Sequence, residues 1–141
     1  MTSRRPRSKT RTQDCGKAEA KTRLDDARTH LDVAQVHGQN ATRAERKASV
    51  SSAVIAGIAA ADAACCHALG QRSRSENHKD ASNLVKQVAP GGPAAASRLQ
   101  RLLALKDESQ YGFGGMGGQK HEVALRQAQS LVEFAEQTLQ R

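Results

Sequence analysis

The sequence is poor in aromatic residues and in proline. Its 141 residues include no tryptophan, one tyrosine and two phenylalanines, and the three prolines stand at positions 6, 90 and 93. Sheets favour aromatic and β-branched side chains, so this composition argues against an extensive sheet. The apolar residues are mostly alanine, leucine and valine, which suit closely packed helices. We therefore predict an all-α fold.

Long hydrophobic runs are also missing. The longest apolar stretch, residues 53–61, ends at Asp62, well short of the ~20 residues that a membrane-spanning helix needs. The positively charged N-terminus is not followed by an apolar segment, as a secretory signal would be. We expect a cytoplasmic protein that does not enter a membrane.

Cysteine is scarce, with Cys15 near the N-terminus and the neighbours Cys65 and Cys66 in an alanine-rich stretch. Adjacent residues of a helix point about 100° apart, so Cys65 and Cys66 are poorly placed to bridge each other. We interpret these two as small buried hydrophobic residues in a reducing cytosol. The five histidines are scattered, and no Cys/His spacing matches a zinc site. We expect neither a metal nor a cofactor.

Positive charge is concentrated at the N-terminus. Residues 1–17 hold six Lys and Arg residues and one Asp, within a chain of net charge +8, so residues 18–141 are nearly balanced. A basic arm of this kind strengthens binding to any polyanion through phosphate contacts. The segment has too few apolar residues to order itself. We predict a flexible basic tail over residues 1–17 and a helical domain over residues 18–141.

The first two helices are marked by apolar spacing and by their end signals. Apolar residues three and four positions apart predict a helix from about residue 18 to 37, ended by Gly38. Thr42 and Glu45 have the spacing of a capping box, and the helix that they open runs to a stop at Gly70. Its middle is apolar on nearly all sides, so we expect it to be the central helix.

Three more helices follow. Ser73 and Glu76 predict the cap of a third helix, on whose apolar side we place His78. Residues 90–93, Pro-Gly-Gly-Pro, separate it from a fourth helix that reaches about Ser109. After a glycine-rich loop, a last helix begins near residue 119. The result is a five-helix bundle with up-down packing.

Three features offer candidate chemistry. The loop at residues 111–118 resembles a phosphate cradle, but it follows no strand and lacks the Lys-Ser/Thr ending, so we favour a hinge or lid. Asp62 stands in the most apolar stretch, where it needs a partner; an arginine of another helix is favoured over a catalytic role. Arg72 and His78 could cleave RNA without a metal, whereas a lone histidine on an apolar face is more often a packed residue.

Three segments, together with the order of elements, resemble the HEPN family of small bacterial helical bundles. They are residues 53–64 (AVIAGIAAADAA), His78-x-x-Ala81, and residues 102–111 (LLALKDESQY). The resemblance covers residues 18–140. It implies a bundle of four or five helices that commonly dimerises. Many such proteins are metal-independent endoribonucleases, often toxins paired with a small nucleotidyltransferase, and others bind nucleotides or have lost activity.

The resemblance also implies where a site would lie. The ribonuclease members have an arginine, four to six residues and then a histidine, in some cases with a tyrosine two positions later. By position, these correspond here to Lys106, Tyr111 and Phe113, so all three depart from the catalytic pattern. A lysine is a point charge and not a planar fork, and a phenol exchanges protons poorly near neutral pH. Lys106 could equally be a solvated helix end, with Tyr111 packed over the bundle.

Two other pairs have the family spacing, namely Arg72 with His78 and Arg23 with His30, though neither stands at the family's position. We therefore expect a catalytically degenerate HEPN-like protein that binds a partner protein, or the phosphate of a nucleotide or RNA, around Lys106, Tyr111 and the loop residues Gly112 and Phe113.

The alternative is a metal-independent endoribonuclease toxin of a toxin–antitoxin pair, with Arg72 and His78 as catalytic residues. An antitoxin or a nucleotidyltransferase-like protein would then be the partner. A nucleic-acid-coating protein that acts through its tail fits less well, because the aromatic residues on which bases stack are missing. The alanine-rich bundle is compatible with a homodimer.

Overall fold

The computed structural model describes residues 11–38, 40–74, 77–111 and 116–141, with the side chains of residues 110 and 111 left undescribed. Within these ranges the fold is an all-α bundle, as predicted. Five helices have eight or more residues, one has six, and two short strands pair near the N-terminus. In chain order the elements are β1 (Thr12–Asp14), α1 (Lys17–Ala34), α2 (Arg43–Leu69), β2 (Gln71–Ser73), α3 (His78–Val85), α4 (Gly92–Leu103), α5 (Lys106–Tyr111) and α6 (Gly118–Leu139).

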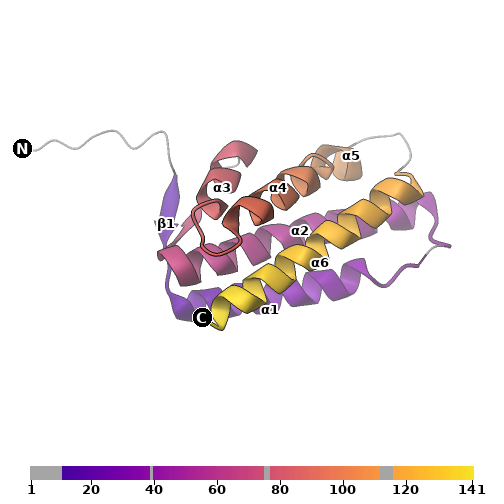
Figure 1. The fold of residues 1–141 in the computed structure, drawn as a ribbon. Coiled ribbons are helices and arrows are strands. Elements are labelled where there is room, and N and C mark those ends of the chain that lie inside the picture. Colours follow the sequence, from indigo (N-terminus) through magenta and orange to yellow (C-terminus); the bar gives the residue numbers. More distant parts are fainter. Residues whose placement is uncertain (1–10, 39, 75–76, 112–115) are drawn as a thin grey trace, which may run out of the picture.

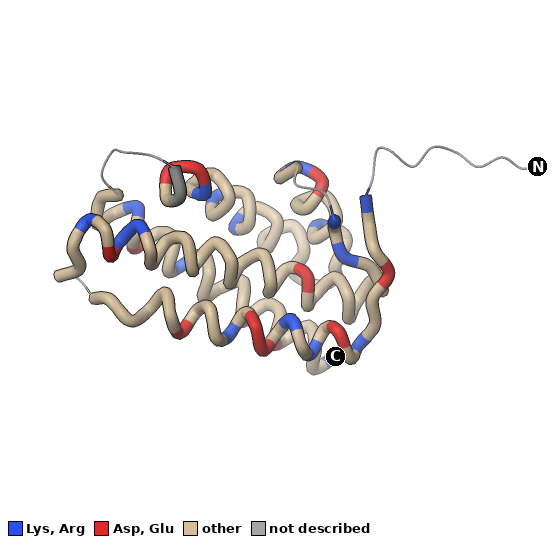
Figure 2. Tube along the Cα trace, turned by 180° about the vertical axis from the view of Figure 1, so that it is seen from behind, with Lys and Arg blue, Asp and Glu red and all other residues tan. Residues whose placement is uncertain are grey.

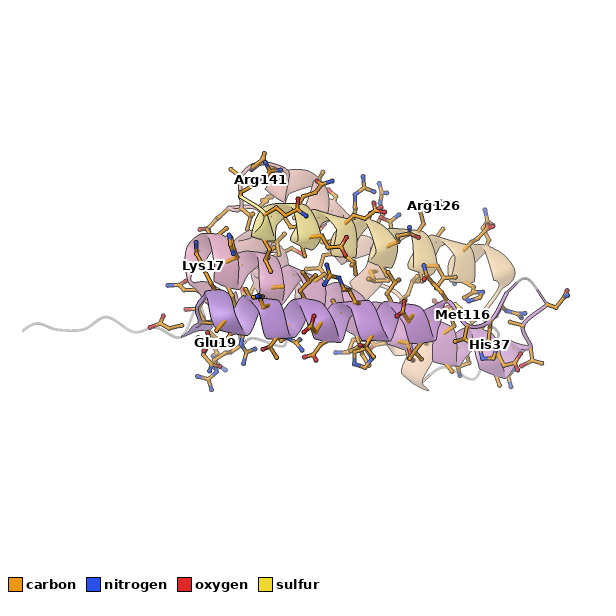
Figure 3. The ribbon with its side chains drawn as sticks, turned by 90° about the horizontal axis from the view of Figure 1, so that it is seen from below. Lys17, Glu19, His37, Met116, Arg126 and Arg141 are labelled. Carbon is orange, nitrogen blue, oxygen red and sulfur yellow. A yellow bond between two sulfur atoms is a disulfide. The ribbon has the colours of Figure 1, made fainter. Side chains whose placement is uncertain are left out.

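The long helices α1, α2 and α6 lie side by side, and α3, α4 and α5 follow one another across α2 and α6 (Figure 1). The chain reverses direction from α1 to α2 and again from α4 to α6, which agrees with up-down packing. Lys17 and Arg141 therefore lie at one end of the bundle, and His37 and Met116 at the other (Figure 3).

Helix α2 begins and ends as its sequence predicts. Glu45 donates its backbone N–H to Thr42 Oγ1 at 3.1 Å, and Glu45 Oε1 accepts the backbone N–H of Thr42 at 2.8 Å. This reciprocal capping box satisfies two backbone donors that would otherwise lack partners. At the other end, Gly70 has φ 73°, a left-handed conformation that glycine adopts without a Cβ penalty.

Helix α2 is also the centre of the core. It packs against both α1 and α6, and Figure 2 shows it as mostly uncharged, whereas charged residues follow α1. By length and hydropathy it could cross a membrane, but 78% of its most apolar window is buried inside the bundle. Such burial is typical of a core helix. The absence of membrane insertion and the cytoplasmic location both stay predictions.

The N-terminal segment differs from the predicted flexible tail. Strand β1 pairs antiparallel with β2, and Gln13 lies opposite Arg72. Cys15 forms a disulfide with Cys66, in the last turns of α2. Residues 12–17 are therefore part of the folded domain, and the predicted boundary after residue 17 was wrong; residues 1–10 lie outside the described residues.

The disulfide corrects the interpretation of the cysteines as well. Cys65 and Cys66 do not bridge each other and both are buried, as expected, but only Cys65 is free. Cys66 pairs across 51 residues with Cys15. Such disulfides are typical of oxidising compartments. The cysteines therefore give no support to a reducing cytosol.

The third and fourth helices depart from prediction in their ends. Asn77 caps α3, its Oδ1 accepting the Lys79 N–H at 2.8 Å, whereas the predicted cap Ser73 lies in β2. His78 is exposed and does not face the core. The predicted fourth helix ends earlier than expected, at Leu103, and residues 106–111 form a separate short helix, α5.

Met116, which was predicted to belong to a flexible loop, is 1% exposed and packs in the core.

A chain of buried hydrogen bonds connects α1, α2 and α6. Ser49 Oγ of α2 donates a hydrogen bond to the carbonyl of Ala34 at the end of α1, and lies 2.8 Å from Nε2 of His121 in α6. Because the serine hydroxyl has a single proton and donates it to Ala34, the His121 nitrogen is the donor to Ser49. Burial lowers the pKa of His121, and the nearby Arg46 and His37 lower it further.

This lowered pKa predicts an acid-sensitive fold. Above the ordinary histidine value of 6.5 the folded and unfolded states both hold a neutral imidazole. As the pH falls below that value, the unfolded chain takes up the proton before the folded one does, so stability decreases until the lowered folded pKa is passed. We expect His121→Gln to weaken this decrease, measured as urea-unfolding free energies between pH 5 and pH 8. An unchanged slope in the variant would show that His121 is not its source.

Candidate functional site

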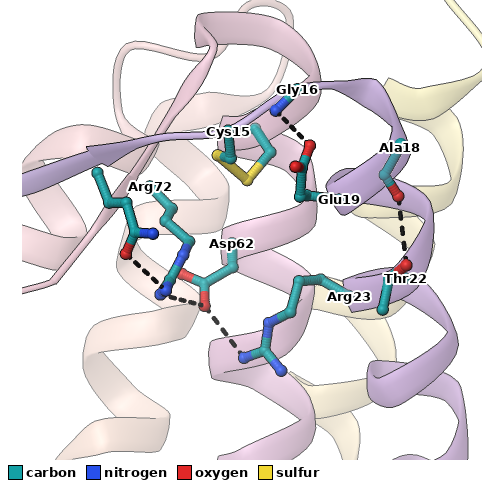
Figure 4. Close-up of a disulfide and its surroundings, with 10 residues drawn as sticks. Cys15, Gly16, Ala18, Glu19, Thr22, Arg23, Asp62 and Arg72 are labelled. Carbon is teal, nitrogen blue, oxygen red and sulfur yellow. Dashed lines mark hydrogen bonds and ion pairs between the residues drawn. A yellow bond between two sulfur atoms is a disulfide. The ribbon is translucent and has the colours of Figure 1, made fainter.

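Asp62 is the centre of a polar cluster between α1, α2 and β2. Its side chain is 12% exposed, and its Oδ2 accepts a hydrogen bond from Nη2 of Arg23 in α1 at 3.0 Å. Arg72 of β2 brings Nη1 to 3.9 Å from the same oxygen (Figure 4). The sequence-based expectation that an arginine of another helix pairs with Asp62 is thus confirmed. A second arginine, from the strand, joins the pair.

The two arginines compete with the effect of burial on Asp62. Burial raises the pKa of the Asp62 carboxyl, and the charges of Arg23 and then Arg72 act against that rise. A carboxylate at so buried a position is tolerated because it has partners of opposite charge. Arg23 has a second carboxylate partner, since Asp26 Oδ2 accepts from its Nη1 at 2.9 Å. With Asp26 counted, two carboxylates balance the two arginines, so any excess positive charge beside this cluster must come from other cationic side chains.

The short sheet holds Arg72 in place. Because β1 pairs with β2, Gln13 lies opposite Arg72, and Gln13 Oε1 accepts from Arg72 Nη2 at 2.9 Å. The ladder extends on both sides, since Cys15 N–H donates to Gly70 O at 3.0 Å and Arg74 N–H donates to Arg11 O at 2.8 Å. The guanidinium of Arg72 thus has an amide oxygen at one terminal nitrogen and a carboxylate near the other.

A pocket of about 320 Å³ opens beside this cluster, a size near the lower limit for small-molecule sites. Among the residues that the structure describes, four cationic side chains and one carboxylate line it, together with a histidine and several uncharged residues. The lining residues are Arg23, Ile58, Asp62, Arg72, Ser73, Arg74, Asn77, His78, Ala81, Leu103 and Lys106. Within the described part of the chain, neither Arg74 nor Lys106 forms an ion pair, so both can neutralise a bound anion. We call this cavity the basic pocket.

The basic pocket brings together candidates that the sequence placed in two different sites. Arg72 and His78, the candidate catalytic pair, share it with Lys106, the candidate binding residue. Lys106 opens α5, and Tyr111 ends that helix. The side chain of Tyr111 lies outside the description, as do Gly112 and Phe113 altogether. Their predicted role in binding stays a prediction.

Sequence reasoning missed Arg74 as a member of the site. The signal was present, since Arg72 and Arg74 are two residues apart, and residues with that spacing in an extended chain point to the same side. It was overlooked because residues 73–76 had been interpreted as a helix cap. Arg23 was noted only for its spacing to His30, yet it enters the pocket as the partner of Asp62, and His30 does not line it.

Metal-dependent chemistry has no candidate centre in the part of the chain that the structure describes. There, no three His, Cys, Asp or Glu side chains come together in a way that could hold a metal ion. The groups that could take part in chemistry in the basic pocket are its cationic side chains, one histidine and the mostly buried carboxylate of Asp62. This set can bind a phosphate group, and its imidazole can move a proton.

Comparisons with known proteins leave the family open. No family model matches the chain, and no curated protein matches it either.

Proposed function

We propose that this protein is a catalytically degenerate HEPN-like bundle that binds the phosphate groups of RNA or of a nucleotide in the basic pocket. The observation that carries the proposal is the excess of cations among the described residues of one small cavity, where Arg23, Arg72, Arg74 and Lys106 stand against the one carboxylate of Asp62. This chemistry favours a phosphate ligand over the partner protein that the sequence left as an alternative. The HEPN resemblance itself rests on the sequence segments.

The apolar lining of the pocket supports a ligand that is more than a phosphate ion. Ile58, Ala81 and Leu103 lie among the cationic residues. Ligand pockets commonly combine an apolar wall with a few charged groups that fix orientation. A nucleotide unit, which has a flat base beside its phosphate, fits such a lining.

The sharpest test removes Lys106, a cation that forms no ion pair with any residue the structure describes. Lys106→Ala is expected to weaken binding of a fluorescently labelled single-stranded RNA about tenfold, and to reduce the salt slope of binding by about one, because one phosphate contact is lost. Arg74→Ala is expected to behave alike. Arg23 and Arg72 are unsuitable for this test, since either substitution would also deprive Asp62 of a partner.

The matched control is Arg126→Ala, which removes an exposed positive charge from α6, outside the pocket (Figure 3). Fluorescence anisotropy should show wild-type affinity for this variant. Competition with ATP and with inorganic pyrophosphate distinguishes a nucleotide site from a site for RNA alone. If Lys106→Ala and Arg74→Ala bind RNA as the wild type does, the proposed site is wrong.

A second candidate function is metal-independent RNA cleavage, because Arg72 and His78 line the same pocket. The histidine would move protons, and the arginine would hold the developing phosphate charge. RNA cleavage in the presence of EDTA that disappears in His78→Ala would establish it over the binding function. A toxin–antitoxin or nucleotidyltransferase partner, and a homodimer, stay predictions.

A further inference from the structure

We propose that the Cys15–Cys66 disulfide controls phosphate binding by the basic pocket, so that the oxidised protein binds and the reduced protein binds weakly. The inference rests on the proposed function and adds a regulation to that same site. It starts from the position of the disulfide, which joins the residue after β1 to the last turns of α2 (Figure 4).

The first step is that β1 depends on the disulfide for its place. Strands β1 and β2 have three residues each and form a sheet of two strands. Such a sheet is marginal in water unless something else holds it. The disulfide follows directly after Asp14, the last residue of β1, and fixes that end to the core helix α2. Without the covalent link, we expect β1 to separate from β2 much of the time.

The second step is that β1 supports the cations of the pocket. Gln13 Oε1 accepts from Nη2 of Arg72, whose Nη1 lies near Asp62, and the carbonyl of Arg11 accepts the backbone N–H of Arg74. When β1 separates, Arg72 loses its amide partner and the backbone at Arg74 loses its ladder bond. Both guanidinium groups then sample more orientations. Binding of a phosphate must order them again, and the lost conformational entropy weakens the affinity.

The third step is the redox chemistry. Cys66 is 1% exposed, whereas Cys15 is partly exposed, so an incoming thiolate meets the sulfur of Cys15. A dithiol reductant attacks Cys15 Sγ, the S–S bond breaks, and Cys66 leaves as a thiolate that takes up a proton. The second thiol of the reductant then releases Cys15 and closes its own disulfide. Two electrons and two protons pass to the protein, which ends with two thiols.

The neighbouring Cys65 does not interfere with this exchange. Burial, with a smaller effect of the Asp62 charge, raises the pKa of the Cys65 thiol to about 12. At neutral pH it is protonated, and a thiol in that form is a poor nucleophile. The disulfide is therefore opened from outside and is not reshuffled from within.

The test compares RNA binding by the oxidised wild type before and after treatment with dithiothreitol, with Lys106→Ala measured in parallel. Reduction is expected to weaken wild-type binding several-fold. Reduction should also make the affinities of wild type and Lys106→Ala for RNA more similar, because the difference between them measures the contribution of the basic pocket. Cys15→Ser should bind like the reduced wild type in both buffers, and Cys65→Ala should remain sensitive to reduction.

A further variant separates regulation from simple unfolding. Gln13→Ala keeps the disulfide but removes the amide that holds Arg72, and it should show part of the loss of affinity in the oxidised state. Far-ultraviolet circular dichroism monitors the helices throughout. Equal binding by oxidised and reduced wild type would overturn the regulation and leave the proposed function intact. Absence of binding in both states would overturn both.

Discussion

Cys15→Ser is expected to lower the free energy of unfolding by about 4 kcal/mol, because the disulfide closes a loop of 51 residues in the unfolded chain. Closing that loop removes conformations from the unfolded state, and serine at position 15 restores them. The loop spans all of α1 and most of α2, the two helices that form the largest contact of the bundle. The loss is large relative to the 5–15 kcal/mol that typically stabilises a domain.

Urea unfolding in a buffer without reductant measures this change. Wild type treated with dithiothreitol provides the control, since it should unfold at the same urea concentration as Cys15→Ser. The two proteins should also agree in the slope of the transition, which reports the surface exposed on unfolding. A variant within 1 kcal/mol of the oxidised wild type would mean that the disulfide contributes little to stability.

Gly57→Val is expected to destabilise the bundle by about 3 kcal/mol, because side chains of α4 and α6 pack against Gly57 and leave no room for a Cβ. A Cβ at this position would lie 2.3 Å from Cδ2 of Leu102 and 3.2 Å from Cδ1 of Leu131. Both leucines are fully buried, so neither has free space into which to turn. Overpacking of a closed core of this kind forces side chains from their rotamers and shifts the helices.

Ala48→Val is the matched control, since it places the same β-branched residue on an exposed position of the same helix. Its cost should be limited to the few tenths of a kcal/mol that separate the helix propensities of alanine and valine. Thermal unfolding followed by circular dichroism compares the two variants. Glycine has a lower helix propensity than valine, so propensity alone would make Gly57→Val stabilising. A loss at Gly57 no larger than the loss at Ala48 would show that the contact with Leu102 does not decide the effect.

The elements that sequence predicted well are those with local signals. Thr42, Glu45 and Gly70 fix the ends of α2 within the chain segment itself, and Pro93 stands in the first turn of α4, where its missing N–H is harmless. Asp62 was correctly expected to have an arginine partner, since burying a lone charge is so costly. The identity of that partner needed the fold.

The features that sequence did not reveal depend on contacts between distant segments. Nothing in the sequence near Cys15 indicates that it meets Cys66, because a cysteine pairing follows from the approach of two backbones. Strand β1 has three residues, too few for a visible alternation, and it exists only beside β2. The basic pocket joins Arg23 to Lys106 across most of the chain, so spacing rules alone placed its members in separate sites.

The central position of α2 has a consequence for how the protein can diverge. From Ala53 to Cys66, every residue is buried except Ile55 and Ile58. A helix with one buried stripe accepts exchanges on its solvent side, at intervals of three or four residues. Helix α2 has almost no such side over this stretch, and most of its residues are already as small as alanine. In α2, tolerated substitutions should therefore be limited to residues of similar volume along the whole stretch. In α1 and α6, tolerated substitutions should repeat every three to four residues, on the solvent-exposed side of each helix.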